Sequence, residues 1–409
     1  MKLLLSSNMT SQFVRQAARA FLDAGMLSEF WTNIARGPKS VWDPFMPKKI
    51  REEMRRRSFD PEILARTRTL PIREGIRLLA TRAGFDSLVR AESGAYSVNG
   101  ITRYLDRRVS DRLSRDTFDA VYAYEDGARL SFRTAKNRGV RCIYELPIGY
   151  WRVGRRIFEE EAELQPEWAS TLEGLNDSKG KTEGKDEEAR LADTIIVPSQ
   201  FVANSLRECP GVTGDVRIVN YGCPTPELSA YKRPKGALRV LFVGSLSARK
   251  GLPYVLEAVK GLDVELTLIG SRPGSQCQPL EKALSTHRYL GSIPRNRVLE
   301  EMRSHDVFAF PTLFEGLANV LLEAISQGLV PITTANSGAS GIIEDGINGF
   351  LVPIRSSKAV SEKLQVLSND RDRLHSMKHC ALDTALAHSW ERYRAELVEA
   401  VRSCKDARP

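Results

Sequence analysis

The feature that most constrains this chain is a repeated alternation of short apolar runs and helix-like segments in its second half. Four apolar runs carry the pattern, at residues 238–243, 264–269, 307–310 and 330–333. Glycine closes the first two, and helix-like stretches occupy 252–259 and 318–327. Strands that alternate with helices form βαβ crossovers, whose parallel strands are buried on both faces. The second half therefore predicts a parallel α/β sheet.

The first half repeats this pattern less regularly. Its strand candidates are residues 2–5, 120–123, 141–144 and 194–197, with a long arginine-rich helical region between the first two. A chain of 409 residues is long enough for two α/β domains. Prolines and glycines at 221–236 punctuate the chain just before the second sheet begins. We therefore predict an N-terminal domain at 1–225 and a C-terminal domain at 226–385.

Composition narrows the class of protein. Hydrophobic residues make up 42% and charged residues 27%, as in a folded globular chain. No run approaches the roughly 18 apolar residues of a membrane span, and the opening apolar run ends at Ser6-Ser7, which favours a strand over a signal peptide. The six cysteines form no CxxC pair and no cluster with histidine, so we expect reduced thiols, no metal site and a cytoplasmic location.

Positive charge is concentrated in the first third of the chain. Residues 1–150 hold 27 Lys and Arg against 17 Asp and Glu, and the formal net charge of the whole chain is +9. One interpretation is a solvated face on arginine-rich helices. Another is a surface that meets anionic membrane lipid or a phosphate-bearing acceptor. Nucleic acid is not expected as a partner, because the interleaved aromatic residues of a single-strand platform are missing.

Residues 243–251 combine a strand end, a loop of small residues and two cations. Gly244 and Ser245 allow backbone N–H groups to approach a phosphate, and the following helix start favours negative charge. Arg249 and Lys250 would supply full charges to hold a diphosphate and to stabilise it as it leaves. A loop with a basic pair is a weak signal when taken alone.

Two glutamates eight residues apart form a second candidate site. Gly316 directly follows Glu315, and Glu323 lies about two turns further along the helix that the segment predicts. Both carboxylates can then lie along one ligand, and carboxylates suit sugar hydroxyls because they accept charge-assisted hydrogen bonds. An ordinary amphipathic helix is the alternative interpretation. The glycine-rich stretch at 338–353 adds only tight turns.

Taken in order, these stretches resemble the retaining glycosyltransferases of family 4. The resemblance covers about 190–355 and is carried by 192–199, 242–251, 268–270, 289–293, 306–312, 315–324, 328–331 and 348–353. It implies the α/β fold called GT-B, with two Rossmann-like domains that face each other across a cleft. The residues Ser389-Trp390-Glu391-Arg392-Tyr393 resemble the tail helix that crosses back, so that 386–409 would complete the first domain.

The resemblance also implies roles for individual residues. The first domain would bind the acceptor, and the second a nucleotide-diphosphate sugar, which is a substrate and not a cofactor. No metal is implied, because a pair of cations would do the work that Mg²⁺ does elsewhere. Arg249 and Lys250 would grip the diphosphate, and Glu323 would bind the ribose. The remaining donor-binding positions would be Glu315 and the backbone of Gly316, Leu317, Ala318 and Asn319 at the sugar, Ile293 at the base, and Gly244, Ser245 and Gly270 in the loops.

The acceptor side departs from the family pattern. Many relatives have a histidine near the reacting centre in the first domain, whereas all five histidines here lie at or beyond His287. Asp126 and Glu145 follow or end predicted strands, where side chains face the cleft of such folds, and they are our acceptor-side candidates. We assign catalytic roles to Glu315, Arg249, Lys250 and Asp126.

The sequence therefore predicts an enzyme that moves a sugar from a nucleotide-diphosphate sugar to a glycan, lipid-linked or small-molecule acceptor, with retention of configuration. Cell-envelope polysaccharide synthesis fits such an enzyme, with peripheral attachment at the inner face of an anionic membrane. Two alternatives stay open: an inactive GT-B protein that serves as a binding scaffold, and a sugar-nucleotide epimerase of the same fold.

Overall fold

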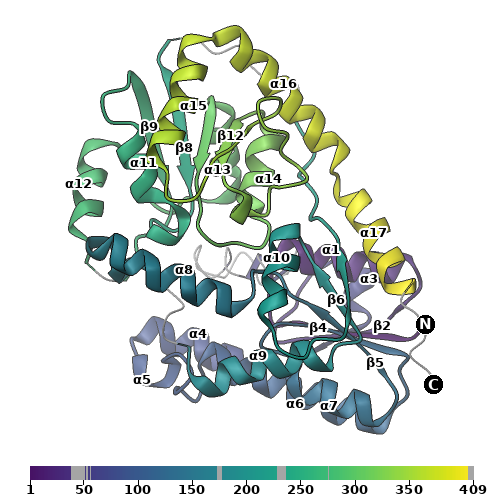
Figure 1. Ribbon diagram of the computed structural model, residues 1–409. Helices are drawn as coiled ribbons and strands as arrows, with labels where there is room; N and C mark the ends of the chain where they lie inside the picture. The colour runs from purple at the N-terminus through teal and green to yellow at the C-terminus, as the bar shows by residue number, and fades with distance from the viewer. Residues whose placement is uncertain are drawn as a thin grey trace.

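The computed structural model describes residues 1–37, 51, 54–55, 57–172, 177–227, 236–274 and 276–403. Two parallel sheets, each covered by helices, form two domains stacked one above the other in Figure 1. The predicted α/β class is confirmed. Arg56, Cys404 and residues 228–235 of the predicted linker lie outside the described residues.

The first sheet has seven strands in the order β3-β2-β1-β4-β5-β6-β7, and every neighbouring pair is parallel. Its strands are β1 (Leu3–Ser6), β2 (Leu27–Thr32), β3 (Thr67–Thr69), β4 (Ala120–Tyr124), β5 (Arg141–Glu145), β6 (Thr194–Val197) and β7 (Asp215–Ile218). The four strands predicted from sequence are present within one residue. The edge strands β3 and β7 were missed because they are short, polar and largely exposed.

Helices cover the two faces of this sheet. They are α1 (Gln12–Asp23), α3 (Pro61–Leu64), α4 (Pro71–Ala83), α5 (Asp86–Val89), α6 (Val98–Arg115), α7 (Arg129–Asn137), α8 (Trp151–Leu164), α9 (Lys179–Leu191) and α10 (Gln200–Ser205). Alternate strand residues point to opposite faces. Val121 and Cys142 pack with α6 and α7, whereas Tyr122 and Ile143 share a core with α1.

The second sheet has six strands in the order β10-β9-β8-β11-β12-β13. Its strands are β8 (Leu238–Val243), β9 (Val264–Ile269), β10 (Arg288–Tyr289), β11 (Val307–Phe310), β12 (Val330–Thr333) and β13 (Phe350–Leu351). Its helices are α11 (Leu252–Ala258), α12 (Gln278–Thr286), α13 (Arg295–Arg303), α14 (Asn319–Ser326), α15 (Ser357–Asn369) and α16 (Arg371–Ala387). All four predicted strands have the predicted bounds, because most of their residues are apolar and buried.

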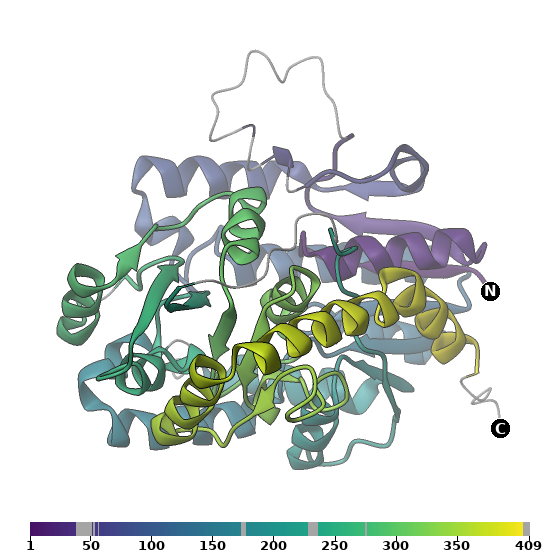
Figure 2. The same ribbon diagram turned by 90° about the horizontal axis from the view of Figure 1, so that it is seen from above.

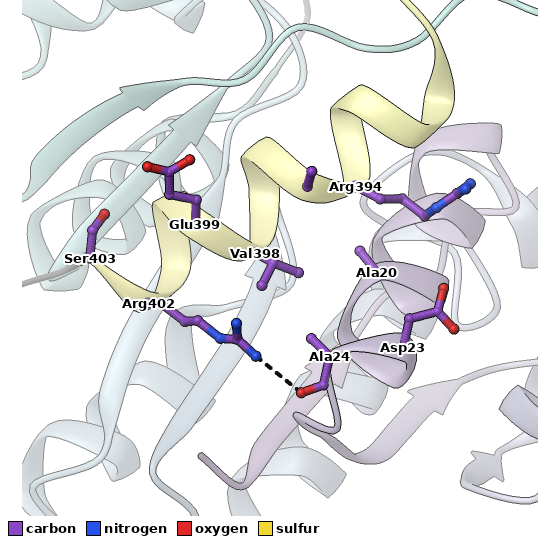
Figure 3. Close-up of a pocket in the computed structure, with 9 residues that line it drawn as sticks. Ala20, Asp23, Ala24, Arg394, Val398, Glu399, Arg402 and Ser403 are labelled. Atoms are coloured by element: carbon purple, nitrogen blue, oxygen red, sulfur yellow. Dashed lines mark hydrogen bonds between the residues drawn. The ribbon is translucent and has the colours of Figure 1, made fainter.

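The last helix, α17 (Trp390–Arg402), crosses from the second domain to the first. Figure 2 shows α16 and α17 in yellow running across the molecule, and α17 packs on α1. Figure 3 shows this contact, in which Arg402 donates a hydrogen bond of 3.2 Å to the carbonyl of Ala24. The predicted crossing helix is confirmed. The predicted boundary after residue 225 falls between β7 and β8, and it stays a prediction.

Helix α8 and the 3-10 helix η2 (Pro166–Thr171) extend from the first domain to the second (Figure 1). Glu161 of α8 is fully buried and accepts hydrogen bonds from the Tyr254 hydroxyl at 2.8 Å and from Arg355 Nε at 2.9 Å. Thr171 Oγ1 accepts one from the backbone N–H of Ala248 at 3.0 Å. These contacts hold the domains together beside the loop that carries Arg249 and Lys250.

Candidate functional site

The candidate site starts where β8 and β9 end, in two loops that contact each other through their backbones. Gly244 N–H donates to the carbonyl of Ile269 at 2.9 Å. A Cβ atom on Gly270 would lie 1.6 Å from the Gly244 oxygen, so only glycine fits there. The two predicted loop glycines, Gly244 and Gly270, therefore allow the loop after β8 to lie against the loop after β9.

Arg249 and Lys250 converge on Glu315, which comes from a separate loop between β11 and α14. Arg249 Nη1 lies 3.0 Å from Glu315 Oε1, and Lys250 Nζ contacts the same oxygen. All three side chains are at most 20% exposed. Ion pairs in such partly buried surroundings are screened less than surface pairs. Two cations therefore meet at one carboxylate, and a pair of adjacent cations suits a diphosphate.

The loop that carries Glu315 also contacts the first domain through its backbone. The carbonyl of Glu315 accepts a hydrogen bond from Gly149 N–H at 3.1 Å, and the carbonyl of Gly316 accepts one from Ser199 Oγ at 2.6 Å. A Cβ atom on Gly316 would lie 1.8 Å from the carbonyl oxygen of Pro147. Gly316 is thus needed for the contact with the first domain.

The rest of this loop leads into α14. Leu317 and Ala318 are buried, and the N–H of Ala318 donates to the carbonyl of Ser337 at 3.0 Å. That amide is already used within the fold, so it is not available to a sugar in the way predicted for the segment Gly316–Asn319. Asn319 begins the helix. The predicted sugar-binding role of the other backbone groups stays a prediction.

Glu323 lies on α14 and pairs with an arginine that the sequence analysis did not identify. Arg295, the first residue of α13, places its Nε 2.5 Å from Glu323 Oε1. Ile293 lies two residues before it, half-buried against the core. Burial and the nearby guanidinium of Arg295 lower the pKa of Arg15, which lies on α1 of the first domain. Arg15 and Arg295, which belong to different domains, are therefore close enough to interact electrostatically.

Arginines at the starts of two helices carry no distinctive sequence signal in a chain with 60 Lys and Arg residues. Only the fold brings Arg15 near Arg295, because their helices belong to different domains. The structure thus groups Arg249, Lys250 and Glu315 by direct contact, and it adds Arg295 as the partner of Glu323.

On the acceptor side, Asp126 lies in the loop after β4. Its φ angle is +69°, an uncommon left-handed conformation for a residue other than glycine, which is found most often at turns and functional sites. Its carboxylate lies 3.8 Å from Lys185 Nζ and 3.9 Å from Lys181 Nζ. The buried Glu188 accepts a hydrogen bond from the N–H of Asp126 at 2.9 Å. Asp126 therefore occupies a rigid loop at the same sheet edge as Pro147–Gly149.

The prediction that Glu145 faces the cleft is wrong. Glu145 is 1% exposed and accepts hydrogen bonds from the hydroxyls of Tyr122 at 2.5 Å and Tyr221 at 3.0 Å. Burial raises its pKa to about 7. Glu145 is still part of strand β5, where side-chain directions alternate, and its position sends it into the core shared with α1 rather than beyond the strand end.

Two Rossmann-like domains, a donor-type loop pair at the edge of the second sheet and a crossing C-terminal helix together define the GT-B class. Solved structures agree with this class. The fold is similar to sucrose-phosphate synthase from Thermosynechococcus elongatus, with a TM-score of 0.69, 16% identity and full coverage of both chains. It is also similar to HepE from Anabaena in complex with UDP, with a TM-score of 0.63, 14% identity and coverage of 98% of this chain and 100% of that chain.

Residues 227–382 match the family described as glycosyl transferases group 1. Phosphatidyl-myo-inositol mannosyltransferase of Mycobacterium leprae is 31% identical over 154 residues, which cover 36% of this chain and 41% of that protein. The lipopolysaccharide core biosynthesis glycosyltransferase LpsE of Rhizobium meliloti is 26% identical over 203 residues, covering 46% and 59%. The matched part thus spans less than two thirds of these relatives. The predicted resemblance to glycosyltransferases is confirmed, and retention of configuration stays a prediction.

Among the described residues, no helix is both long enough and apolar enough to cross a membrane.

Proposed function

We propose that this protein transfers a sugar from a nucleotide-diphosphate sugar to an acceptor, with retention of anomeric configuration. The observation that carries the proposal is the cluster of Arg249, Lys250 and Glu315. It lies in the segment that matches glycosyl transferases group 1 and beside the loop that contacts the first domain. Cations held in place before the reaction stabilise a leaving diphosphate without a reorganisation step.

The proposed roles follow from the contacts. Arg249 and Lys250 bind the diphosphate and stabilise its charge as the bond to the sugar breaks. Glu315 holds both cations in place and accepts hydrogen bonds from sugar hydroxyls. Glu323 binds the ribose in place of its present partner, Arg295. The two cations supply the charge stabilisation, so the proposed reaction requires no divalent metal and no cofactor.

Retention of configuration fits a substitution on one face of the sugar. The acceptor oxygen attacks the anomeric carbon on the side from which the diphosphate leaves. The bond from that carbon to the phosphate oxygen breaks, and this oxygen takes the acceptor proton. No histidine base is required for this step. Asp126 is our acceptor-side candidate, where it would hydrogen-bond an acceptor hydroxyl.

The acceptor class is proposed from the relatives. Their names include a phosphatidyl-myo-inositol mannosyltransferase, a lipopolysaccharide core transferase and the capsular polysaccharide transferase CapM of Staphylococcus aureus. We therefore propose a glycan or lipid-linked glycan acceptor in cell-envelope polysaccharide synthesis. The basic first third of the chain supports a peripheral contact with anionic lipid at the cytoplasmic face of a membrane.

Isothermal titration with UDP, GDP and ADP tests the proposal. We expect one nucleotide to bind, with an affinity that falls about tenfold or more in Lys250→Ala and Glu323→Ala, because each loses a charge-assisted hydrogen bond. Lys260→Ala is the matched control, since Lys260 is an exposed lysine on the same domain. Binding that is equal in all variants would contradict the site, and no binding to any nucleotide would favour the scaffold alternative.

A further inference from the structure

Helices α4 and α5 of the first domain expose large apolar side chains to an unusual degree. Ile72 is 77% exposed, Leu79 67% and Phe85 59%, and Leu88 and Val98 are also exposed. All five lie between residues 72 and 98. Scattered exposed apolar residues are normal, whereas such a cluster marks an interaction surface. We call residues Ile72, Leu79, Phe85 and Leu88 the α4–α5 face.

The geometry of α4 separates this face from the side that packs on the domain. Ile72 and Leu79 are seven residues apart, so they lie on the same side of the helix. Glu74, on the opposite side of the helix, is buried. Arg73 stacks on the ring of Tyr104 in α6, with 4.4 Å between its guanidinium carbon and the ring centre. The side of α4 that carries Ile72 and Leu79 therefore faces outward and is apolar.

The charge around the α4–α5 face is positive. Residues 66–90, all of which the structure describes, include six arginines and two acidic residues. One of these acids, Glu74, is buried and ion-paired with Arg57 at 2.8 Å and with Arg77 at 2.7 Å. Asp86 is thus the one exposed acid in this range, whereas Arg66, Arg68, Arg82 and Arg90 are exposed.

We infer that the α4–α5 face binds the surface of an anionic lipid bilayer. Apolar side chains on a helix that lies flat enter the boundary between headgroups and acyl chains, and arginines around them pair with lipid phosphates. Excess positive charge matches a surface of lipid phosphates. The inference deepens the peripheral membrane contact proposed above, because it names the surface that makes the contact.

The position of this face fits the proposed direction of acceptor entry. Figure 1 shows α4 and α5 at the end of the first domain that lies away from α17, and they belong to the domain assigned to the acceptor. A bilayer bound there would present a lipid-linked acceptor to the first domain. The donor-binding domain would remain exposed to nucleotide sugars in solution.

Co-sedimentation with vesicles tests the inference. The full chain is mixed with phosphatidylcholine vesicles, or with vesicles that also contain about 30% phosphatidylglycerol, at about 0.1 M salt. We expect binding to the anionic vesicles alone, and a partition coefficient at least about tenfold lower for the double variant Leu79→Ser/Phe85→Ser. The matched control is Leu164→Ser/Leu386→Ser, which removes two exposed leucines elsewhere and should bind as the wild type does.

A second variant and two further measurements separate the outcomes. Arg82→Gln/Arg90→Gln should weaken binding to anionic vesicles while leaving the apolar residues in place. Nucleotide titration of every variant reports on folding and on the donor site. If the wild type binds anionic vesicles but no nucleotide, the proposed function is contradicted and the membrane inference is not. Absence of binding to anionic vesicles, or equal binding by Leu79→Ser/Phe85→Ser, would overturn the inference. So would a dimer in sedimentation velocity that this double variant dissociates, because the face would then serve self-association.

Discussion

The Glu315 carboxylate accepts a hydrogen bond from Arg249 at 3.0 Å and contacts Lys250 through the same oxygen. The residues come from two loops that follow different strands, β11 and β8, which are neighbours in the second sheet. The carbonyl of Phe314 also accepts from Arg249 Nη1 at 3.1 Å. The loop that carries Glu315 thus fixes the positions of both cations. Because the same loop contacts the first domain, the donor site depends on the contact between the two domains.

Glu315→Gln should slow donor turnover about 10- to 100-fold. The amide keeps the size of the side chain but loses the charge-assisted hydrogen bonds, each of which is worth roughly 1.5–3 kcal/mol. The measurement is release of the nucleoside diphosphate from the sugar nucleotide whose nucleotide binds in titration. Glu257→Gln is the control, because Glu257 is an exposed glutamate of the same domain. Equal rates for the wild type and Glu315→Gln would contradict the assigned role.

Glu323 and Arg295 should respond differently to substitution, although they form one ion pair. Glu323→Gln should weaken nucleotide binding about tenfold, because a charged acceptor for the ribose hydroxyls is lost. Arg295→Ala should change it by less than about fivefold, since Arg295 is 60% exposed and pairs of this kind contribute little. Isothermal titration with the preferred nucleotide measures both. A loss with Arg295→Ala as large as that with Glu323→Gln would show that Arg295 itself holds the nucleotide.

Four strands of the second sheet were predictable from sequence because most of their residues are apolar and buried, whereas the two-residue strands β10 and β13 were missed. Largely apolar runs at 238–243 and 264–269 gave β8 and β9 with their observed bounds. The strands missed in the first sheet lack this signal. The edge strand β7 has mostly exposed residues, and β2 contains Ser28 and Glu29 between apolar positions. Backbone pairing with a neighbour, which sequence periodicity does not report, decides their structure.

The candidate site was predictable where one short segment carries several of its residues. Arg249 and Lys250 are adjacent in sequence, as are Glu315 and Gly316, so the ordered set of short motifs that contains them indicated their chemistry. Arg15 near Arg295 depends on how two domains pack, and no local pattern encodes it. The orientation of Glu145 depends on where β5 ends relative to the pleat, and an error of one residue reverses the face.

Gly316→Ala should destabilise the contact between the domains. The new Cβ would lie 1.8 Å from the Pro147 oxygen, so one backbone segment must move, at a cost of about 1–3 kcal/mol in the free energy of unfolding. Gly180→Ala is the matched control, since no atom lies within 4 Å of its Cβ position in α9 and alanine favours a helix. Urea unfolding measures both variants. A Gly316→Ala variant as stable as the wild type would show that the loop moves freely.

The buried ion pair of Glu161 should stabilise the protein much more than its exposed neighbour does. Glu161→Ala leaves Arg355 Nε and the Tyr254 hydroxyl without their carboxylate, so we expect a loss of about 3 kcal/mol in the free energy of unfolding. Glu160 pairs with the same arginine at 2.8 Å but is about half exposed, and Glu160→Ala should change that free energy by less than about 1 kcal/mol. Similar losses in urea unfolding of the two variants would contradict this difference.

The pH dependence of stability should contain a contribution from Glu145. Its pKa in the folded protein is raised to about 7, whereas 4.5 is the ordinary value. Between these values the folded state holds the proton and the unfolded state does not. The contribution of Glu145 to the free energy of unfolding is therefore fully present below pH 4.5. It falls by about 1.4 kcal/mol per pH unit as the pH rises to 7. Glu145→Gln cannot titrate, so the wild type should lose stability relative to this variant between these pH values, as measured by urea unfolding. Parallel curves would place the pKa of Glu145 near its ordinary value.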